Sequence, residues 1–377
     1  MSQSRIETSE SENSSIKKCP TYSNKTKPKP KRIQPTHKQS HVLFNVKNKL
    51  EEKTIIPQRK QRQLNTINYN IEEKKISKAL NNASPTNSSL KESIHYTIEK
   101  KHKGKEYSIL KDESNNILFE FSYKEDKNRI FKDRMEDKGK SVINFNEKPN
   151  DILLTLFDGH GGDTVSSFLE HNFDKFLKKN ISNEIPLKKS ISKTFFDIDN
   201  EIKDKSITEG STGTIILLTE ENNKKVIYCA NIGDTRCCLF NNKDIEQLSY
   251  DHRVTDPKEK DRIIHSGGFI RNGRVNGKLM LSRVFGDFEF KHLGVKCEPY
   301  IIRKEIDCNI KNQFIVLASD GLWDAIEDNF IEEFIYETVE KENKNESITK
   351  QICDRLVTEC FNFGSSDNIS VFVMKLS

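Results

Sequence analysis

The sequence lacks a long hydrophobic run, and it lacks any pair of cysteines spaced as Cys-x-x-Cys. Because a bilayer span needs about 18 to 20 consecutive apolar residues, we expect no membrane-spanning segment and no membrane partner. The first residues show neither the apolar stretch of a secretory signal nor a glycine for myristoylation, so we expect a soluble protein of the cytoplasm, the nucleus or both. The eight cysteines have no regular spacing, which argues against a zinc knuckle or a disulfide framework. We expect most of them to be reduced core residues.

Hydrophobic residues are also scarce, at 34% of the chain, whereas charged residues reach 32%. This balance predicts that part of the chain does not fold. Residues 1–100 carry a net charge of +11 and the remainder carries −6. We therefore predict a disordered basic tail over residues 1–90 and one folded domain over residues 91–377. The basic run at residues 25–32 suits a nuclear-import signal or a polyanion-binding patch, although such runs are also common by chance in Lys-rich tails.

Beyond the tail, the spacing of apolar residues predicts strands and helices in mixed order. The expected strands are 94–98, 117–121, 152–157, 214–218, 225–231, 236–240, 314–318 and 369–375, and the expected helices are 164–180, 185–202, 327–340 and 347–360. The apolar run at 152–157 is typical of a strand buried on both faces. The three strands between 214 and 240 follow one another closely, which predicts antiparallel pairing. The pattern indicates an α+β fold in which strands outnumber helices.

Three aspartates lie at the ends of predicted strands. Asp158 follows one buried strand, Asp320 follows another, and Asp367 directly precedes the last strand. Strand ends can meet at one rim of a sheet, and carboxylates gathered there would repel one another unless cations neutralised them. Oxygen ligands suit Mg²⁺ or Mn²⁺ better than zinc. The pattern therefore favours a two-metal site, although any single Asp-Gly pair is more often a simple turn.

A series of motifs in fixed order resembles the metal-dependent protein phosphatase family of the 2C type. The motifs are Met135-Glu136-Asp137, Phe157 to Gly162, Gly210 to Thr214, Ala230 to Arg236, Asp251-His252, Arg274 to Gly277, Leu281 to Asp287, Ala318 to Asp324, and Ser366 to Val371. Each motif alone is a weak signal, but nine in order make coincidence implausible. The resemblance covers about residue 117 to the end of the chain.

The resemblance implies a fold and a metal site. The fold would be a sandwich of two antiparallel sheets flanked by helices, with metal ions at one end of it. Two Mg²⁺ or Mn²⁺ ions would be held there, with a weaker third ion in some family members. Carried over by position, the metal ligands are Asp158 as the bridge, the Gly159 carbonyl and Glu136 on one ion, Asp320 and Asp367 on the other, and Asp234 and Asp324 for the third.

The resemblance also implies a reaction, the hydrolysis of phosphoserine and phosphothreonine in proteins by a water that bridges the two ions. Asp137 corresponds to an acid that orients this water. His160 lies two residues after the bridging Asp158, so it is a candidate to protonate the leaving oxygen. The alternative for His160 is a turn histidine that bonds neighbouring carboxylates. Phosphorylated proteins are the expected partners, and we expect a monomer.

The phosphate-binding residue departs from the family pattern. The family usually has an arginine three residues before the Met of Met-Glu-Asp, and this sequence has Lys132 there. Arg129 and Arg134 lie close enough in the sequence to replace it. Because lysine cannot form the two-pronged hydrogen bond of arginine, Lys132→Ala should raise KM with little change in kcat; an unchanged KM would favour Arg129 or Arg134.

Two other functions compete with the phosphatase. A catalytically weak or dead family member could act as a scaffold or regulator, which the presence of every expected metal-binding acid disfavours. Alternatively, the basic tail could bind nucleic acid or an anionic surface, although we do not expect nucleic acid as a partner. A cysteine-based phosphatase fits poorly beside the ordered acidic motifs, although Cys297 is followed by five residues and Arg303, the spacing that such an enzyme uses.

Overall fold

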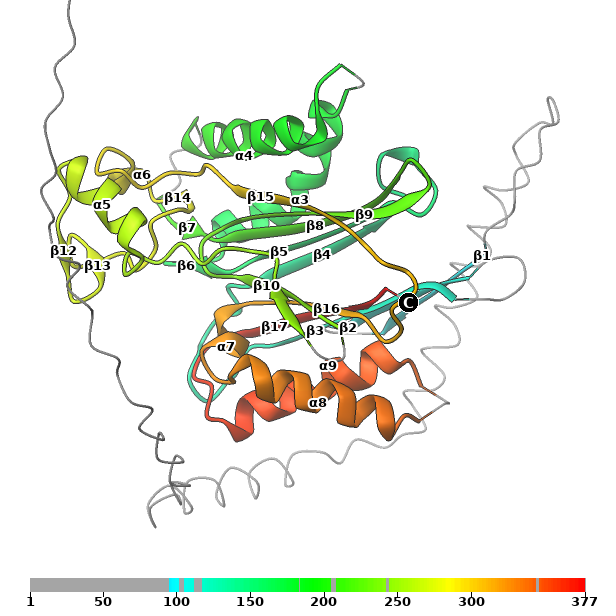
Figure 1. Ribbon diagram of the computed structural model, residues 1–377. Coiled ribbons are helices and arrows are strands. Elements are labelled where there is room, and N and C mark those ends of the chain that lie inside the picture. Colours follow the sequence, from blue (N-terminus) through cyan, green and yellow to red (C-terminus); the bar gives the residue numbers. More distant parts are fainter. Residues whose placement is uncertain are drawn as a thin grey trace, which may run out of the picture. The chain divides into compact units, whose positions relative to one another are not determined.

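The computed structural model describes residues 95–101, 105–111, 117–182, 184–204, 208–241, 244–343 and 346–376, with side chains from Phe119 onward (Figure 1). All of these belong to the second of the two units into which the chain divides, residues 90–377. The predicted tail, its basic run and Cys19 lie outside the described residues.

The first of two main sheets has seven strands, and every neighbouring pair in it is antiparallel. In spatial order its strands are β1 (His95–Lys101), β2 (Lys105–Lys111), β3 (Ile117–Asp126), β17 (Ile369–Lys375), β16 (Phe314–Ala318), β10 (Arg236–Phe240) and β11 (Ile245–Gln247). The last strand of the chain therefore lies in the centre of this sheet, between β3 and β16.

The second main sheet has five strands, again all antiparallel. Its order is β15 (Tyr300–Glu305), β9 (Lys224–Ile232), β8 (Gly213–Glu221), β5 (Ile152–Phe157) and β4 (Lys138–Ile143). Two smaller sheets complete the strands, one of β14 (Phe285–Gly286), β7 (Gly210–Ser211) and β6 (Gly159–His160), and one of β12 (Ile270–Arg271) and β13 (Arg274–Val275).

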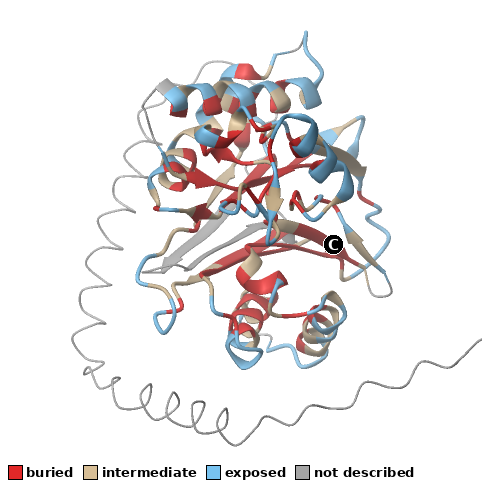
Figure 2. Cartoon of the chain, turned by 90° about the vertical axis from the view of Figure 1, so that its left-hand side faces the viewer, coloured by how far each residue is buried: buried red, intermediate tan, exposed pale blue. Residues whose placement is uncertain are grey.

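Helices cover the outer faces of the two main sheets, so the fold has four layers (Figure 1). Helices α3 (Thr164–Asn180) and α4 (Leu187–Asp204) lie over the five-stranded sheet, and α8 (Asp328–Glu340) and α9 (Ile348–Asn362) over the seven-stranded sheet. The short 3₁₀ helix η1 (Phe145–Glu147) links β4 to β5. Three hydrophobic clusters fill the three spaces between the layers, and buried residues concentrate in the strands and on the helix faces next to them (Figure 2).

Strand β5 shows why the sequence adopts this arrangement. All six of its residues are buried, as the continuous apolar run predicted. Successive side chains of a strand point to opposite faces, so Ile152, Leu154 and Leu156 join the cluster between the sheets. Leu153 and Phe157 join the cluster beneath α3 and α4. The predicted α+β sandwich of two antiparallel sheets is confirmed.

Several sequence predictions need correction. The pattern missed β2, whose sequence is largely polar, and it missed β4 and β15, whose residues are half buried or exposed along their whole length. Strands β9 and β10 were expected to pair, yet they lie in different sheets. The turn at Gly233-Asp234 therefore carries the chain from one sheet to the other. Cys237 and Cys238 do point to opposite faces, but neither is at the surface, because both faces of β10 are covered.

The segment between β11 and β15 forms a small subdomain with its own core. It contains α5 (Pro257–His265), β12, β13, β14 and α6 (Phe288–Lys291), and its apolar residues pack into a separate cluster. Asp256 caps α5 by accepting hydrogen bonds from the backbone of Lys258 and Glu259. We call residues 258–294 the flap segment.

In the part of the chain that the structure describes, no helix combines the length and apolar character needed to span a bilayer. The seven described cysteines are all free, and six of them are buried. Trp323 is buried and donates its indole hydrogen to the carbonyl oxygen of Ala318 at 2.9 Å.

Candidate active site

The three aspartates at strand ends lie at one end of the sandwich. Asp158 follows β5 of one sheet, while Asp320 opens the short helix α7 (Asp320–Trp323) after β16 of the other. Asp367 precedes β17, which pairs with β16. Beyond burial, which is the larger cause, the charges of Asp320 and Asp367 help to raise the pKa of Asp158, and the charge of Asp367 helps to raise the pKa of Asp320. The structure therefore brings them together from both sheets, as the positions at strand ends predicted.

Asp158 and Asp320 are half-buried and the Asp367 side chain is 43% exposed, and negative charge on one of these acids disfavours charge on its neighbours. Burial is the main cause that raises the pKa of Asp158 well above its usual range, and the charges of Asp137 and Asp320 raise it further. Burial and the charge of Asp234 likewise raise the pKa of Asp320. Burial raises the pKa of Asp137 to about 6, and its Oδ2 atom has no hydrogen-bond partner among the described residues. The cluster has more negative charge than the protein around it neutralises.

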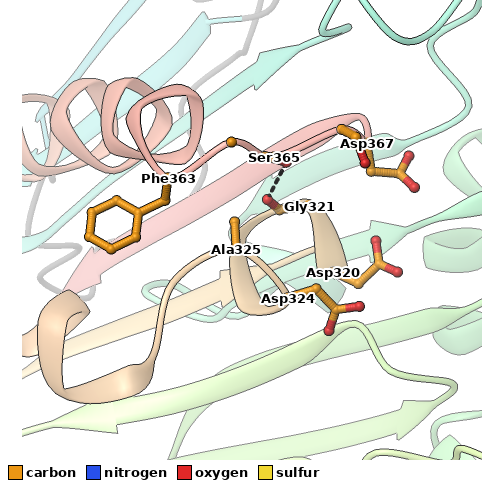
Figure 3. A pocket seen from close by; sticks show the side chains of 9 residues that line it. Asp320, Gly321, Asp324, Ala325, Phe363, Ser365 and Asp367 are labelled. Atoms are coloured by element: carbon orange, nitrogen blue, oxygen red, sulfur yellow. Dashed lines mark hydrogen bonds between the residues drawn. The ribbon is translucent and has the colours of Figure 1, made fainter. Parts of the chain in front are cut away.

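The chemistry of this cluster fits divalent cations. Carboxylate and carbonyl oxygens are the ligands that Mg²⁺ and Mn²⁺ prefer. Asp320, Asp324 and Asp367 line a cavity of about 200 Å³, and their carboxylates point to the same side of it (Figure 3). Among the described side chains, no three His, Cys, Asp or Glu residues already form a complete ligand set. The surplus of buried charge and the unpaired Oδ2 of Asp137 are what a cation would satisfy.

The segment that carries Glu136 and Asp137 is held by a buried asparagine. The backbone N–H of Glu136 donates to Oδ1 of Asn368 at 2.8 Å. The side-chain amide of Asn368 in turn donates to the carbonyl oxygens of Lys127 (2.9 Å) and Arg134 (3.0 Å). Because Asn368 is adjacent to Asp367, it fixes the position of Glu136 relative to an acid far away in the sequence.

Gly159 lies against the same segment, where no larger residue fits. The hydroxyl of Ser166 donates to the carbonyl oxygen of Glu136 at 2.6 Å. A Cβ atom at Gly159 would come within 2.7 Å of that hydroxyl and 2.8 Å of that carbonyl oxygen. The glycine therefore permits the close approach of two residues that the sequence predicts to share an ion.

His160 pairs with an acid from the edge of the flap segment. Its Nε2 lies 2.5 Å from Oδ2 of Asp287, and since a carboxylate only accepts, the ring nitrogen donates. About a third of the His160 side chain is exposed (34%), whereas Asp287 is nearly buried. A Cβ at Gly210 would lie 2.3 Å from the His160 Nε2. The histidine is thus held in one orientation while one edge of its ring stays accessible.

Of the three candidate phosphate-binding residues, only Lys132 contacts the acid cluster. Its Nζ forms an ion pair with Oδ1 of Asp367. Burial alone would lower the pKa of Lys132, but the hydrogen bond and charge of Asp367 raise it above its usual value. Arg129 and Arg134 are exposed, and neither side chain makes a hydrogen bond or ion pair within the described residues. The substrate role of all three residues stays a prediction.

Asp234 and Asp324, the two acids predicted to bind a third ion, are both paired with an arginine. Arg253 donates from Nε to Oδ2 of Asp234 at 2.8 Å and from Nη2 to Oδ1 of Asp324 at 2.7 Å. One guanidinium therefore already bridges both carboxylates, and the pair does not fit an additional cation as it stands.

Three residues that organise this site were not predicted from the sequence: Asn368, Asp287 and Arg253. Asn368 lies in the motif Ser366 to Val371, next to the predicted metal ligand Asp367, and Asp287 ends the motif Leu281 to Asp287. Arg253 follows the Asp251-His252 motif directly. A signal was present in each case, but which distant atom each side chain would reach depends on the folded structure.

Comparison with known proteins agrees with this architecture. The sequence matches the family model described as Protein phosphatase 2C over residues 121–369. A probable protein phosphatase 2C of Caenorhabditis elegans is 32% identical over 238 residues, which cover 60% of this chain and 64% of that protein. Protein phosphatase 2C homolog 2 of Schizosaccharomyces pombe is 33% identical over 258 residues, covering 64% and 69% respectively. The chain thus spans about two thirds of the length of these relatives.

Solved structures share the fold. A phosphatase from a pathogenic strain of Toxoplasma gondii superposes with a TM-score of 0.59 at 20% identity, covering 68% of this chain and 92% of that one. A sex-determining protein of C. elegans gives the same TM-score at 23% identity, covering 68% and 64%. With the family match over most of the described domain, the chain belongs to the protein phosphatase 2C family.

Proposed function

We propose that this protein is a metal-dependent phosphatase that removes phosphate from phosphoserine and phosphothreonine in other proteins. The observation that carries the proposal is the group of partly buried carboxylates that both sheets bring to one end of the sandwich. Each raises the proton affinity of its neighbours, which is the electrostatic condition of a site built for cations. Membership of the protein phosphatase 2C family supports the same activity.

The residues that would hold two ions are those placed around this end. Glu136, Asp158 and the Gly159 carbonyl would hold one, and Asp158, Asp320 and Asp367 the other. When bound, the ions would supply positive charge that offsets the negative charge of the phosphoryl oxygens. They would also lower the pKa of water, so that hydroxide is available to attack phosphorus. Asp137 is buried with one free oxygen, so it is suited to accept a hydrogen bond from that water and orient it.

His160 is suited to protonate the leaving oxygen of serine or threonine. Its bond to Asp287 fixes the orientation of the ring. The threonine oxygen of a phosphopeptide is a poor leaving group that needs a proton. The nitrophenolate of a nitrophenyl phosphate leaves without one. His160→Gln should therefore slow peptide hydrolysis by roughly 10² or more and aryl phosphate hydrolysis far less.

Lys132 would attract the substrate phosphate as a simple charge. Its present partner is Asp367, and an ion held by Asp367 would leave the ammonium group available to a phosphate oxygen. Lys132→Ala is expected to raise KM with little change in kcat.

The test uses the full-length protein with a phosphothreonine peptide and an aryl phosphate in Mn²⁺, Mg²⁺ or EDTA. Asp158→Asn and Asp320→Asn should abolish turnover, and EDTA should abolish it in the wild type. Asp261→Asn, which changes an exposed acid on α5, is the matched control and should retain full activity. Metal-independent turnover, or turnover that survives in both site variants, would contradict the proposal.

A folded wild-type protein that binds Mn²⁺ but hydrolyses neither substrate would instead support a scaffold or regulator. The location in the cytoplasm or nucleus and the monomeric state stay predictions.

A further inference from the structure

Three separate parts of the fold meet at Arg253. Asp234 lies in the turn where the chain crosses from β9 to β10, and Asp324 ends α7. Arg253 lies just before α5 and forms an isolated antiparallel bridge with Leu281 of the flap segment. Its guanidinium joins the two aspartates at 2.8 and 2.7 Å. No other arginine of the described residues spans two of the acids that the sequence analysis assigned to metal ions.

The Asp234 arm of this bridge is shielded from water, whereas the Asp324 side chain on the other arm is 51% exposed. The side chains of Asp234 and Arg253 are 7% and 28% exposed, respectively, so water screens their attraction only in part. Arginine also keeps its proton at every pH at which proteins fold. The positive charge between the two acids is therefore permanent.

The rest of the acid cluster lacks such a partner. Within the described chain, the ion pairs of this cluster are those of Lys132 with Asp367 and of Arg253 with Asp234 and Asp324, so neither Asp158 nor Asp320 is paired with a basic side chain. Asp158 and Asp320 therefore still need cations to neutralise them, whereas Arg253 already neutralises Asp234 and Asp324.

We propose that Arg253 takes the place of a third metal ion in this protein. The guanidinium neutralises Asp234 and Asp324 and ties the base of the flap segment to α7 without a metal. This inference rests on the proposed function, because it concerns how many ions the metal-dependent site holds. It predicts that the wild-type protein has no ion bound at Asp324.

The experiment counts Mn²⁺ ions bound per full-length chain, by equilibrium dialysis and by the loss of the free-Mn²⁺ electron paramagnetic resonance signal. Wild type is compared with Asp324→Asn, Arg253→Met, and the double variant of Arg253→Met with Asp324→Asn. Arg271→Met is the matched control, because Arg271 is an exposed arginine of the flap segment without an ion pair among the described residues. Circular dichroism confirms that each variant is folded.

The expected result has three parts. Asp324→Asn binds as many ions as the wild type, Arg253→Met binds one more, and the double variant returns to the wild-type number. Arg271→Met leaves the number unchanged. A wild-type ion that disappears in Asp324→Asn would overturn the inference, and so would a folded Arg253→Met that gains no ion.

The comparison of wild type with Asp324→Asn needs no substitution at Arg253, so the test stands even if Arg253→Met fails to fold. Failure of the proposed function is a separate outcome, a wild-type protein that binds no Mn²⁺ at all. In that case a gain of one ion in Arg253→Met would still support the role of Arg253, and the absence of a gain would contradict it.

Discussion

At the scale of single residues, the candidate site depends on close contacts that only particular side chains permit. Gly159 and Gly210 allow backbone segments to approach within distances that a Cβ atom would block. Asn368 uses both ends of its amide to join two segments. Each of these residues acts through its shape or hydrogen bonds and not through reactive chemistry, so their substitution should disturb the positions of the acids and of His160.

Gly210→Ala tests the orientation of His160. The added methyl group would lie 2.2 Å from Oδ2 of Asp287 and 2.3 Å from Nε2 of His160, so the pair must separate. We expect peptide hydrolysis to fall about 10² fold, the lower range for loss of general acid catalysis, with Mn²⁺ affinity unchanged. Gly267→Ala, at a turn where the methyl group meets open space, is the control and should lose only stability. Equal kinetics in the two variants would refute this view of His160.

Asp151 provides a pH-dependent test of stability away from the site. Burial raises its pKa to about 6, although Thr219 donates a hydrogen bond to it at 2.9 Å. A carboxyl whose pKa is raised in the folded state destabilises the protein at pH values above that pKa. This cost is removed as the pH falls through about 6 toward the ordinary aspartate value of about 4.

Asp151→Asn should therefore stabilise the protein relative to wild type more at pH 7.5 than at pH 4.5. Urea unfolding of both proteins at the two pH values measures this, and the difference between the proteins cancels the titration of other groups. A difference that is constant with pH, or that grows toward pH 4.5, would contradict the raised pKa.

At the scale of elements, the short helix α7 links the core to the site. It carries Asp320 at its start and is followed by Asp324. Trp323 anchors it to β16, and the hydroxyl of Ser365 donates to the Gly321 carbonyl oxygen at 2.7 Å (Figure 3). The helix is too short to be stable alone, so these contacts decide where its two acids lie.

Gly321→Ala tests this dependence on packing. A Cβ at this position would lie 1.9 Å from the carbonyl oxygen of Asn368, so α7 must move away from the loop before β17. The distance between Asp320 and Asp367 should change, and we expect Mn²⁺ affinity to fall at least ~10-fold, about 1.4 kcal/mol. Calorimetric titration with Mn²⁺ measures this. Gly277→Ala, in the flap segment, where the added methyl group would make only an ordinary contact 3.9 Å from Arg271 Cδ, should leave Mn²⁺ affinity unchanged. An unchanged affinity in Gly321→Ala would contradict this dependence on packing.

At the scale of the whole molecule, the sandwich brings the site together because its two sheets pack face to face. Phe372 of β17 is fully buried in the cluster between them and stacks on Tyr123 with ring centroids 4.3 Å apart. Phe372→Ala should reduce the free energy of unfolding by about 3 to 5 kcal/mol. Urea unfolding measures the loss, with Phe269→Ala as control because Phe269 is 56% exposed. If Phe372→Ala lowers the free energy of unfolding by less than about 1 kcal/mol, the packing of the two sheets does not depend on the hydrophobic cluster between them.

The sequence predicted best those elements whose hydrophobic pattern is strong. The apolar run at 152–157 and the amphipathic helix at 164–180 match β5 and α3 residue for residue. The edge strands β4 and β15 and the hairpin strand β2 were missed. In β4 and β15 the burial does not alternate between faces, so the period of two that marks a strand is absent.

For the site, motif order alone located the acids and His160, because those residue types are needed for the chemistry and lie at strand ends. Partners were harder to predict. The pairing of His160 with Asp287, of Lys132 with Asp367, and of Arg253 with two acids joins residues 71 to 235 positions apart in all but one case. No local pattern encodes such distances.

The sequence by itself determined the class of fold, the family and the residue types available for a metal-dependent reaction, because these depend on local patterns and motif wording. Only the tertiary structure decided that β9 and β10 lie in different sheets, which places Asp234 at the end of the sandwich. It also decided which charges remain unpaired there and which Arg253 already neutralises. The physical reason is that electrostatic and hydrogen-bond partners are set by distances in space, and packing of the two sheets sets those distances.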